Sequence, residues 1–325
     1  MFLCALRASV VNNEAMKLKV AVAQATPCVL DLAGSVAKAC EWIAEAGRQG
    51  ARLLAFPETW IPVYPLWCDM GSFSKWNHEP AKRLQARLRA NSLAAGSAEL
   101  KAIAEAAGRA GVAVVLGANE RDDRNGTLYN TLFFISSDGR VLGRHRKLVP
   151  TFGERLVWGQ GDASGLRAYD DNGLRFGGLV CWEHWMPLSR HVLHAEGEVV
   201  HAAAWPHGGE MHQVASRHYA FEGRCFVMLA ASYMTRQSIP ADFEMAEDLA
   251  GAPDVLLNGG SAVIAPDGSY VAGPITGSEQ LLLVEIDTDR ADQEKLTLDV
   301  AGHYSRPDLF ELRVDRRELR QFQDK

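Results

Sequence analysis

The feature that most constrains the fold is the alternation of short apolar runs with helical segments in the first part of the chain. Residues 19–24 alternate apolar and polar positions as a strand does, and residues 31–50 show helical periodicity that ends in glycine. Residues 52–56 form a short apolar run, residues 97–111 repeat the helical pattern, and residues 112–118 supply another buried strand. This order of strand, helix and strand predicts an α/β fold.

The later part of the chain adds hairpins to this pattern. Strands at 127–135 and 139–146 are predicted to join at a Ser-Asp-Gly turn, and residues 260–271 form a second predicted hairpin. Because alternation comes first and hairpins follow, a layered α/β sandwich fits better than a closed (β/α) barrel. The other predicted strands are 174–180, 199–204, 225–231 and 281–286, and the other predicted helices are 187–196 and 211–222.

Length and composition limit the domain organisation and the partners. The chain has 325 residues and no linker-like tract, so we expect one domain over residues 16–312 and a short C-terminal tail at 313–325. Residues 1–15 are interpreted as a disordered N-terminal arm or the result of an upstream start codon choice. A net charge of −6 with scattered Lys and Arg argues against nucleic acid as a partner. No run reaches the ~18 apolar residues of a membrane span, so we expect no membrane partner.

Cysteine usage indicates the compartment. The six cysteines are widely spaced and form no CxxC pair, in a chain large enough to need no disulfides. This pattern is typical of a reducing environment, so we expect a cytoplasmic protein.

Three residues near predicted strand ends have the chemistry of a nucleophilic site. Cys181 directly follows the apolar run at 174–180, where α/β folds place reactive groups. Glu58 ends another apolar run, and a carboxylate in low dielectric has its pKa raised into the range useful for proton abstraction. Lys147 offers a cation for charge that develops on a substrate. Glu154 follows seven residues later, close enough in sequence to orient that ammonium group.

Each of these residues also has a purely structural explanation. A cysteine after an apolar run is commonly an inert core residue, and a glutamate after Phe-Pro is commonly a cap. Lys147 beside two arginines fits a solvated positive face. The longer strings that contain these residues decide between the two interpretations.

Five longer strings carry a family likeness: PETW at 57–60, HRKLVPTFGERLVWGQGD at 145–162, GGLVCWEHWMP at 177–187, AAWP at 203–206 and GHYSRPD at 302–308. They resemble the nitrilase branch of the carbon–nitrogen hydrolase superfamily, and the likeness runs from about residue 17 to 312. The resemblance implies that Glu58 is the general base, Lys147 the cationic stabiliser, Cys181 the nucleophile and Glu154 an additional supporting carboxylate.

The resemblance also implies a fold and an assembly. The family fold is a four-layer αββα sandwich whose protomers pair face to face, so we expect a homodimer or a larger homo-oligomer, with spirals as the largest form. This chain continues only a short distance past residue 308, which leaves the largest assemblies open. Val63 stands where relatives usually have glycine, and His184 where asparagine is common. Both departures are expected near the pocket, where they could alter substrate choice.

The activity implied is hydrolysis of a small-molecule nitrile by water to a carboxylic acid and ammonia, through a cysteine thioimidate and then a thioester. No metal or organic cofactor is expected. An amidase and a cyanide hydratase or dihydratase share this chemistry and stay open as alternatives. A non-catalytic scaffold is a more remote one, because all four candidate residues are present. A thiol redox role lacks a partner at CxxC spacing.

Aromatic residues beside the strand-end motifs are the candidates for an apolar substrate pocket. The backbone amide of Trp182 is a candidate oxyanion donor, and Glu183 holds the turn, holds a neighbouring arginine or touches substrate. The candidate pocket residues are Trp60, Tyr64, Phe152, Trp182, Trp185, Trp205 and His207.

The histidines and glycines of the chain point to neither a metal nor a phosphate site. The histidines at 184, 191 and 194 lack the spacing of a metal motif, and those at 201, 207 and 212 are expected to form no tight cluster. Gly117, Gly126 and the Gly-Gln-Gly string at 159–161 are interpreted as turns.

Overall fold

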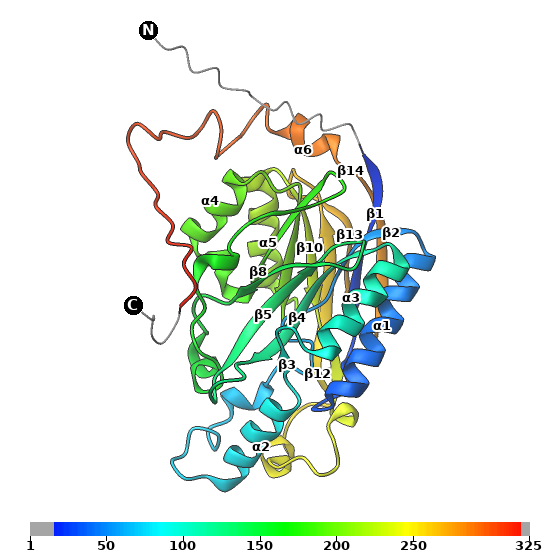
Figure 1. Ribbon diagram of the computed structural model, residues 1–325, viewed down its shortest axis with the longest axis vertical. Coiled ribbons are helices and arrows are strands. Elements are labelled where there is room, and N and C mark those ends of the chain that lie inside the picture. Colours follow the sequence, from blue (N-terminus) through cyan, green and yellow to red (C-terminus); the bar gives the residue numbers. More distant parts are fainter. Residues whose placement is uncertain (1–15, 320–325) are drawn as a thin grey trace.

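Two seven-stranded sheets with helices on their outer faces make up the computed structural model, which describes residues 16–319 (Figure 1). The arm expected at residues 1–15 and the last six residues of the expected tail lie outside the described residues. The domain boundaries proposed from the sequence stay a prediction.

The first sheet contains most of the strands of the N-terminal half. The strands β1, β2 and β4 run parallel, as expected for strands linked by helices, whereas the pairs β14–β1, β4–β5 and β5–β6 are antiparallel. The order is β14 (Gln280–Asp287), β1 (Lys17–Gln24), β2 (Ala51–Ala55), β4 (Ala113–Arg121), β5 (Leu128–Ile135) and β6 (Val141–Arg146), with β3 (Leu93–Ala94) beside β4.

The second sheet is built from the C-terminal half. Its three central strands β8, β9 and β10 are parallel and almost fully buried, so their sequences are continuously apolar instead of alternating. The order is β11 (Tyr233–Thr235), β12 (Val255–Ile264), β10 (Phe226–Ala231), β9 (Val200–Trp205), β8 (Leu174–Val180) and β7 (Tyr169–Asp171), with β13 (Tyr270–Thr276) beside β12.

Two of the helices begin at a residue whose side chain caps them. Asp31 accepts a hydrogen bond from the Gly34 N–H ahead of α1 (Leu32–Arg48), and Ser97 accepts one from the Leu100 N–H ahead of α3 (Ala98–Ala110). Gly111 ends α3 in the left-handed conformation, with φ at 67°. The other α-helices are α2 (Glu79–Ala90), α4 (Pro187–Ala195), α5 (Glu210–Gly223) and α6 (Asp289–Glu294).

Alternating side chains separate the layers. Along β1, Val20 and Val22 lie in the core between the two sheets, whereas Ala21 and Ala23 pack with residues of α1 and α3. Figure 1 shows α1 and α3 beside the first sheet and α4 and α5 beside the second. The expected four-layer αββα sandwich is therefore confirmed.

The elements missed by the sequence patterns lie at the periphery. The helix α2 has only Ala81, Leu84 and Leu88 buried along twelve residues, so its apolar stripe is narrow. The strands β7 and β11 have three residues each and the helix α6 has six, too short for a clear period. Within residues 16–319, no helix has the length and apolar character needed to cross a bilayer.

Candidate active site

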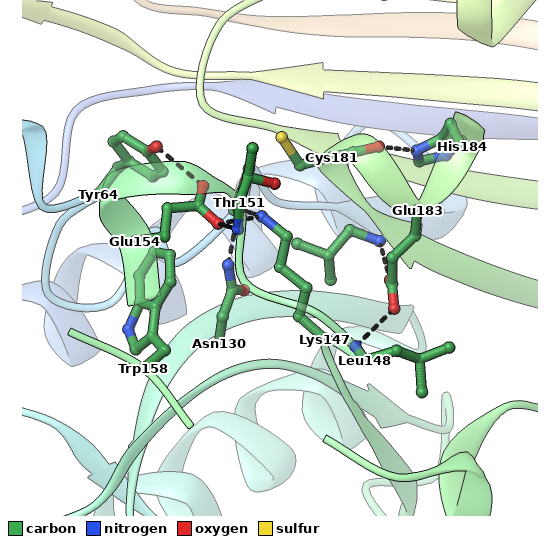
Figure 2. Close-up of polar contacts among 12 residues, drawn as sticks. Tyr64, Asn130, Lys147, Leu148, Thr151, Glu154, Trp158, Cys181, Glu183 and His184 are labelled. Carbon is green, nitrogen blue, oxygen red and sulfur yellow. Dashed lines mark hydrogen bonds and ion pairs between the residues drawn. The ribbon is translucent and has the colours of Figure 1, made fainter. Parts of the chain in front are cut away.

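The four residues singled out from the sequence come together between the two sheets. Glu58 follows β2 and Lys147 follows β6 in the first sheet, whereas Cys181 follows β8 in the second. A carboxylate oxygen of Glu58, a carboxylate oxygen of Glu154 and the Cys181 sulfur lie within 4.8 Å of one another. Figure 2 shows Lys147 reaching toward Glu154 with Cys181 nearby.

A close backbone approach positions Glu58. The turn after β2 passes directly over β4, where a Cβ atom on Gly117 would lie only 1.9 Å from the Pro57 carbonyl oxygen. The Ile61 N–H donates to the Gly117 carbonyl at 3.1 Å and fixes this crossing. Gly117 is therefore not the turn residue expected from the sequence. It lies within a strand and makes room for the segment that carries Glu58.

Lys147 is buried between two carboxylates. Its Nζ donates to Glu58 Oε1 at 2.9 Å and to Glu154 Oε2 at 2.6 Å. Glu154 is held in turn by the Thr151 N–H at 2.7 Å and by the Tyr64 hydroxyl at 3.0 Å. The expectation that Glu154 lies close enough to orient the ammonium group agrees with this geometry.

Glu58 has one engaged and one free oxygen. Asn130 Nδ2 donates to Oε1 at 2.6 Å, beside the Lys147 bond, and Oε2 has no hydrogen-bond partner among residues 16–319. Burial raises the pKa of Glu58 to about 7, although Lys147 and Asn130 act in the opposite direction. A carboxylate with a free oxygen and such a pKa is suited to accept a proton near neutral pH.

Cys181 lies on a strained turn at the end of β8. Its φ is 53°, in the left-handed region, and it begins the short helix Cys181–Trp185. Burial, and then the nearby Glu58, raise the pKa of the Cys181 thiol well above its usual value. The thiol is thus protonated at rest, so it needs a base within reach at the moment it attacks.

Glu183 holds this turn, which is one of the alternatives left open by the sequence, and it also lines the cavity beside Cys181. Its carboxylate accepts hydrogen bonds from the N–H groups of Val180 and Leu148, both at 2.8 Å, and lies 3.0 Å from His145 Nε2. Burial alone would raise the pKa of Glu183, but these contacts hold it below its usual value. Glu183 therefore ties the nucleophile turn of one sheet to the lysine segment of the other.

A cavity of about 1090 Å³ opens next to Cys181. Five of the seven candidate pocket residues lie in its lining, which also includes Leu66, Val149 and Met186. Whether they contact substrate stays a prediction. The five are Tyr64, Phe152, Trp182, Trp185 and His207.

Trp60 and Trp205 do not line this cavity, which corrects their assignment to the pocket. The Trp60 indole N–H donates to the Ala25 carbonyl at 2.9 Å, and its ring packs under the first sheet. The Trp205 N–H donates to Ser216 Oγ at 3.1 Å, and its ring stacks on His184. The backbone positions were near the site, but both side chains point into the core.

The two departures from the family pattern are also buried. Val63 is 1% exposed and His184 is 1% exposed, and neither lines the cavity. A direct role of these side chains in contacting substrate is therefore not supported.

The histidines cluster, contrary to the expectation from their spacing. His184 Nε2 lies 3.0 Å from His201 Nε2, and the His207 and His212 rings are 4.5 Å apart. The sequence could not reveal this, because the members come from a turn, a strand, a loop and a helix. The sequence patterns gave no indication of the contact between His184 and His201.

Among residues 16–319, two buried groups of side chains have possible metal-ligand atoms that lie close together. In the first, Glu58, Glu154 and Cys181, the Lys147 ammonium already bonds to both carboxylates and supplies positive charge. The second is His194, Glu198 and Cys225. The Glu198 oxygens there already contact His201 and Tyr219. The absence of a metal cofactor stays a prediction.

Comparison with known proteins places these features in a family. The model of the carbon-nitrogen hydrolase family matches residues 19–295. A nitrilase named Nitrilase 2, from an unknown prokaryotic organism, is 40% identical over 308 residues, which cover 94% of this chain and 95% of the relative. An aliphatic nitrilase of Sinorhizobium fredii is 37% identical over 300 residues, which cover 92% of this chain and 96% of the relative.

Solved structures share the fold at lower identity. A Saccharomyces cerevisiae member of branch 10 of the nitrilase superfamily aligns with a TM-score of 0.69 at 18% identity, covering 89% of this chain and 96% of that one. An amidase from Nesterenkonia sp. aligns with a TM-score of 0.59 at 18% identity, covering 85% and 92%. These likenesses agree with the four-layer architecture.

Proposed function

We propose, since this chain belongs to the nitrilases of the carbon–nitrogen hydrolase family, that it hydrolyses an organic nitrile to a carboxylic acid and ammonia at Cys181. The observation that carries the proposal is the buried cluster in which a thiol, a carboxylate with a free oxygen and an ammonium group meet beside a cavity.

The first half of the reaction forms a covalent bond to the enzyme. Glu58 takes the proton of the Cys181 thiol as sulfur attacks the nitrile carbon, so that a C–S bond forms and one C–N π bond breaks. The proton passes from Glu58 to the nitrogen, which gives a thioimidate. Lys147 offsets the negative charge that develops on this nitrogen.

The second half consumes two waters. Glu58 removes a proton from the first water as it adds to the thioimidate carbon, and the C–N bond then breaks to release ammonia and leave a thioester. The second water cleaves the C–S bond, which releases the carboxylic acid and restores the thiol. The sum is one nitrile and two waters converted to one acid and one ammonia, without an external cofactor.

Lys147 is suited to stay charged throughout. Burial disfavours an ammonium group, but the acidic neighbours of Lys147 outweigh burial and raise its pKa above the usual value. The backbone N–H of Trp182, the residue after Cys181, is a further donor for charge that develops on the substrate.

The size of the cavity favours an organic nitrile over cyanide. A space of about 1090 Å³, lined by aromatic and aliphatic side chains together with polar ones such as Asp69 and Arg155, is far larger than a two-atom substrate needs. Amide release is the second candidate outcome, because the tetrahedral intermediate yields an amide when it expels the thiolate instead of ammonia.

We also propose that the protein is cytoplasmic and forms a homodimer or a larger homo-oligomer. The five cysteines within the described residues are free thiols, which fits a reducing compartment. The assembly follows from the face-to-face pairing typical of the family.

The test measures acid, amide and ammonia released from aliphatic, benzylic and aromatic nitriles, from cyanide, and from the matching amides. We expect acid and ammonia from nitriles, and no turnover by Cys181→Ala at an unchanged unfolding temperature. The matched control is Cys28→Ala, a half-buried thiol outside the site, which should keep full activity. Ammonia release from nitriles by purified Cys181→Ala protein would contradict the mechanism, and turnover of amides alone would contradict the substrate class.

A further inference from the structure

A series of buried polar side chains, none of which lines the cavity, leads away from the nucleophile. The Cys181 carbonyl oxygen lies 2.7 Å from His184 Nδ1, and His184 Nε2 lies 3.0 Å from His201 Nε2. His201 Nδ1 lies 2.9 Å from Glu198 Oε2, and the Tyr219 hydroxyl donates to Glu198 Oε1. These four side chains are at most 3% exposed, so solvent does not satisfy them.

The hydrogen positions in this chain follow from counting donors and acceptors. A carbonyl oxygen only accepts, so His184 must carry its hydrogen on Nδ1. The Nε2 atom of a neutral His184 is then an acceptor, and His201 must donate from its own Nε2. Burial lowers the pKa of His184 to about 3, which keeps that ring neutral.

One more proton is required at the contact between His201 and Glu198. With a hydrogen on Nε2, His201 meets Glu198 Oε2 through Nδ1, and one hydrogen must lie between these two atoms. Either Glu198 is a carboxylic acid beside a neutral ring, or it is a carboxylate beside an imidazolium ion. Both forms hold the same number of protons, so the bond to the Cys181 carbonyl depends on one proton shared by Glu198 and His201.

Packing holds the imidazole rings of His184 and His201 in place, so they cannot rotate out of their hydrogen bonds when the shared proton is lost. The His201 ring stacks on Tyr219 with centroids 3.8 Å apart, and the His184 ring stacks on Trp205 with centroids 4.9 Å apart. Both stacks have an interplanar angle of 26°. With the rings held in place, a change in protonation changes which atom donates instead of rotating the rings away.

We propose that His184, His201 and Glu198 are positioning residues that hold the Cys181 turn through one shared proton, in support of the proposed nitrile hydrolysis on which this inference rests. Loss of that proton leaves Glu198 as a carboxylate that accepts from His201 Nδ1. His201 Nε2 then bears a lone pair, so His184 must donate from Nε2. Its Nδ1 lone pair then faces the Cys181 carbonyl at 2.7 Å, which repels the turn.

Several other ionisable groups lie around Glu198, the end of this hydrogen-bonded series that is farther from Cys181. From α4, His194 Nδ1 lies 3.7 Å from Glu198 Oε1, and from α5, Glu222 lies 3.4 Å from His194 Nε2. Cys225 belongs to the same cluster, and Lys295 lines a cavity of about 200 Å³ together with His194 and Glu198.

Other ionisable groups lie around His184 and His201, closer to Cys181. Arg190 donates to the His184 carbonyl. Burial, and then His194, lower the pKa of His201 well below its usual value, while Glu183 raises it and His145 lowers it further. Burial, opposed by His194, raises the pKa of Glu198 to about 7. The protonated, working form is therefore present at low pH and is lost as pH rises.

The decisive experiment compares Glu198→Gln with Glu198→Ala across pH 6 to 10. A glutamine amide donates to His201 Nδ1 and accepts from Tyr219, but it does not ionise. We expect wild-type kcat to fall on the alkaline side, Glu198→Gln to keep kcat within about threefold at pH 7 and lose this fall, and Glu198→Ala to lose about tenfold. Asp171→Asn, an acid-to-amide change at another buried carboxylate, should retain the wild-type profile.

A second comparison tests the end near the nucleophile. His184→Asn keeps a donor for the Cys181 carbonyl but cannot reach on to His201, whereas His184→Leu removes the donor. We expect His184→Leu to lower kcat about tenfold or more with KM changed less than about threefold, and His184→Asn to restore most of kcat. In the His184→Asn background, Glu198→Ala should have no further effect.

The outcomes separate this inference from the proposed function. Identical alkaline profiles for wild type and Glu198→Gln, a wild-type kcat that stays constant to pH 10, or a Glu198→Gln protein as impaired as Glu198→Ala at the same unfolding temperature would each overturn the inference. If one of these three results is found and the Cys181→Ala protein is inactive, the inference is wrong but the proposed function is still supported. Active Cys181→Ala protein removes the proposed function itself.

Discussion

At the scale of single residues, the site depends on unequal use of two carboxylates. Both oxygens of Glu154 are engaged, by the Tyr64 hydroxyl on one side and by Lys147 and the Thr151 N–H on the other. Glu58 keeps one oxygen without a partner among the described residues. Two acids on one ammonium group thus have separate roles, since one holds Lys147 in place and the other is open to a proton.

This difference predicts the pH dependence of Glu58→Gln. A base must be ionised to act, and the Glu58 pKa is raised to about 7, so wild-type kcat/KM should rise with pH through that region. Glutamine cannot accept the proton, so the variant should lack this rise of kcat/KM on the acid side of the pH profile. Its kcat should fall roughly 10²–10⁴-fold. The measurement is kcat/KM against pH between 5 and 8. A variant that keeps both this rise and the rate would show that another group is the base.

The candidate residues that the structure brings together and those that it leaves in the core differ in what fixes their side chains. The strings around Glu58, Lys147 and Cys181 placed these residues at strand ends, and the structure brings them together. Trp60 and Trp205 occupy similar positions along the chain but point into the core. A shift of one residue along a strand reverses the face, and sequence spacing near a strand end does not reveal which face is used.

At the scale of elements, the position of Glu58 depends on how closely its turn crosses β4. Gly117→Ala places a methyl group 1.9 Å from the Pro57 carbonyl oxygen, so the segment must move. We expect the free energy of unfolding to fall by about 1–3 kcal/mol, and turnover to fall as well because the base leaves its position. Thermal unfolding and nitrile turnover of the purified variant provide the two readouts.

Gly126→Ala is the matched control for this prediction. An added Cβ at Gly126 meets nothing within 4 Å, so stability and activity should both stay close to wild type. If Gly117→Ala behaves like Gly126→Ala, the crossing is not what holds Glu58 in place.

Elements also explain why the buried histidine chain was missed. His184 lies on the turn after β8, His201 on β9, and Tyr219 on α5, so the chain forms only when the second sheet and its helix pack together. Metal motifs are visible in a sequence because one helix supplies neighbouring ligands. A network assembled from three elements leaves no such spacing.

At the scale of the whole molecule, the site is a product of sheet packing. The first sheet supplies the base and the lysine, the second supplies the nucleophile, and Glu183 bonds to the backbone on both sides of this interface. The alternating and continuous apolar patterns predicted both sheets. The distance between the strand ends depends on core packing, which no local pattern encodes.

The C-terminal segment contacts this two-sheet body through polar groups and through Val314, which packs against the core between the sheets. Arg316 pairs with Glu196 at 2.6 Å, Glu318 pairs with Arg144 at 3.6 Å, and the Leu319 N–H donates to Asp162 at 2.9 Å. None of these contacts touches the four candidate catalytic residues. Partly exposed pairs of this kind contribute only about 0–1 kcal/mol each.

Removal of residues 313–325 therefore tests the domain boundary predicted from the sequence. The truncated chain should keep kcat within about twofold and lose only a few degrees, roughly 2–4 °C per kcal/mol, in unfolding temperature. Arg316→Ala separates the ion pair with Glu196 from the rest of the segment, and it should account for only part of the shift. Differential scanning calorimetry and nitrile turnover provide the comparison. If the truncated chain aggregates or loses activity while Arg316→Ala does not, the segment belongs to the domain, because its backbone packing would then matter more than its charges.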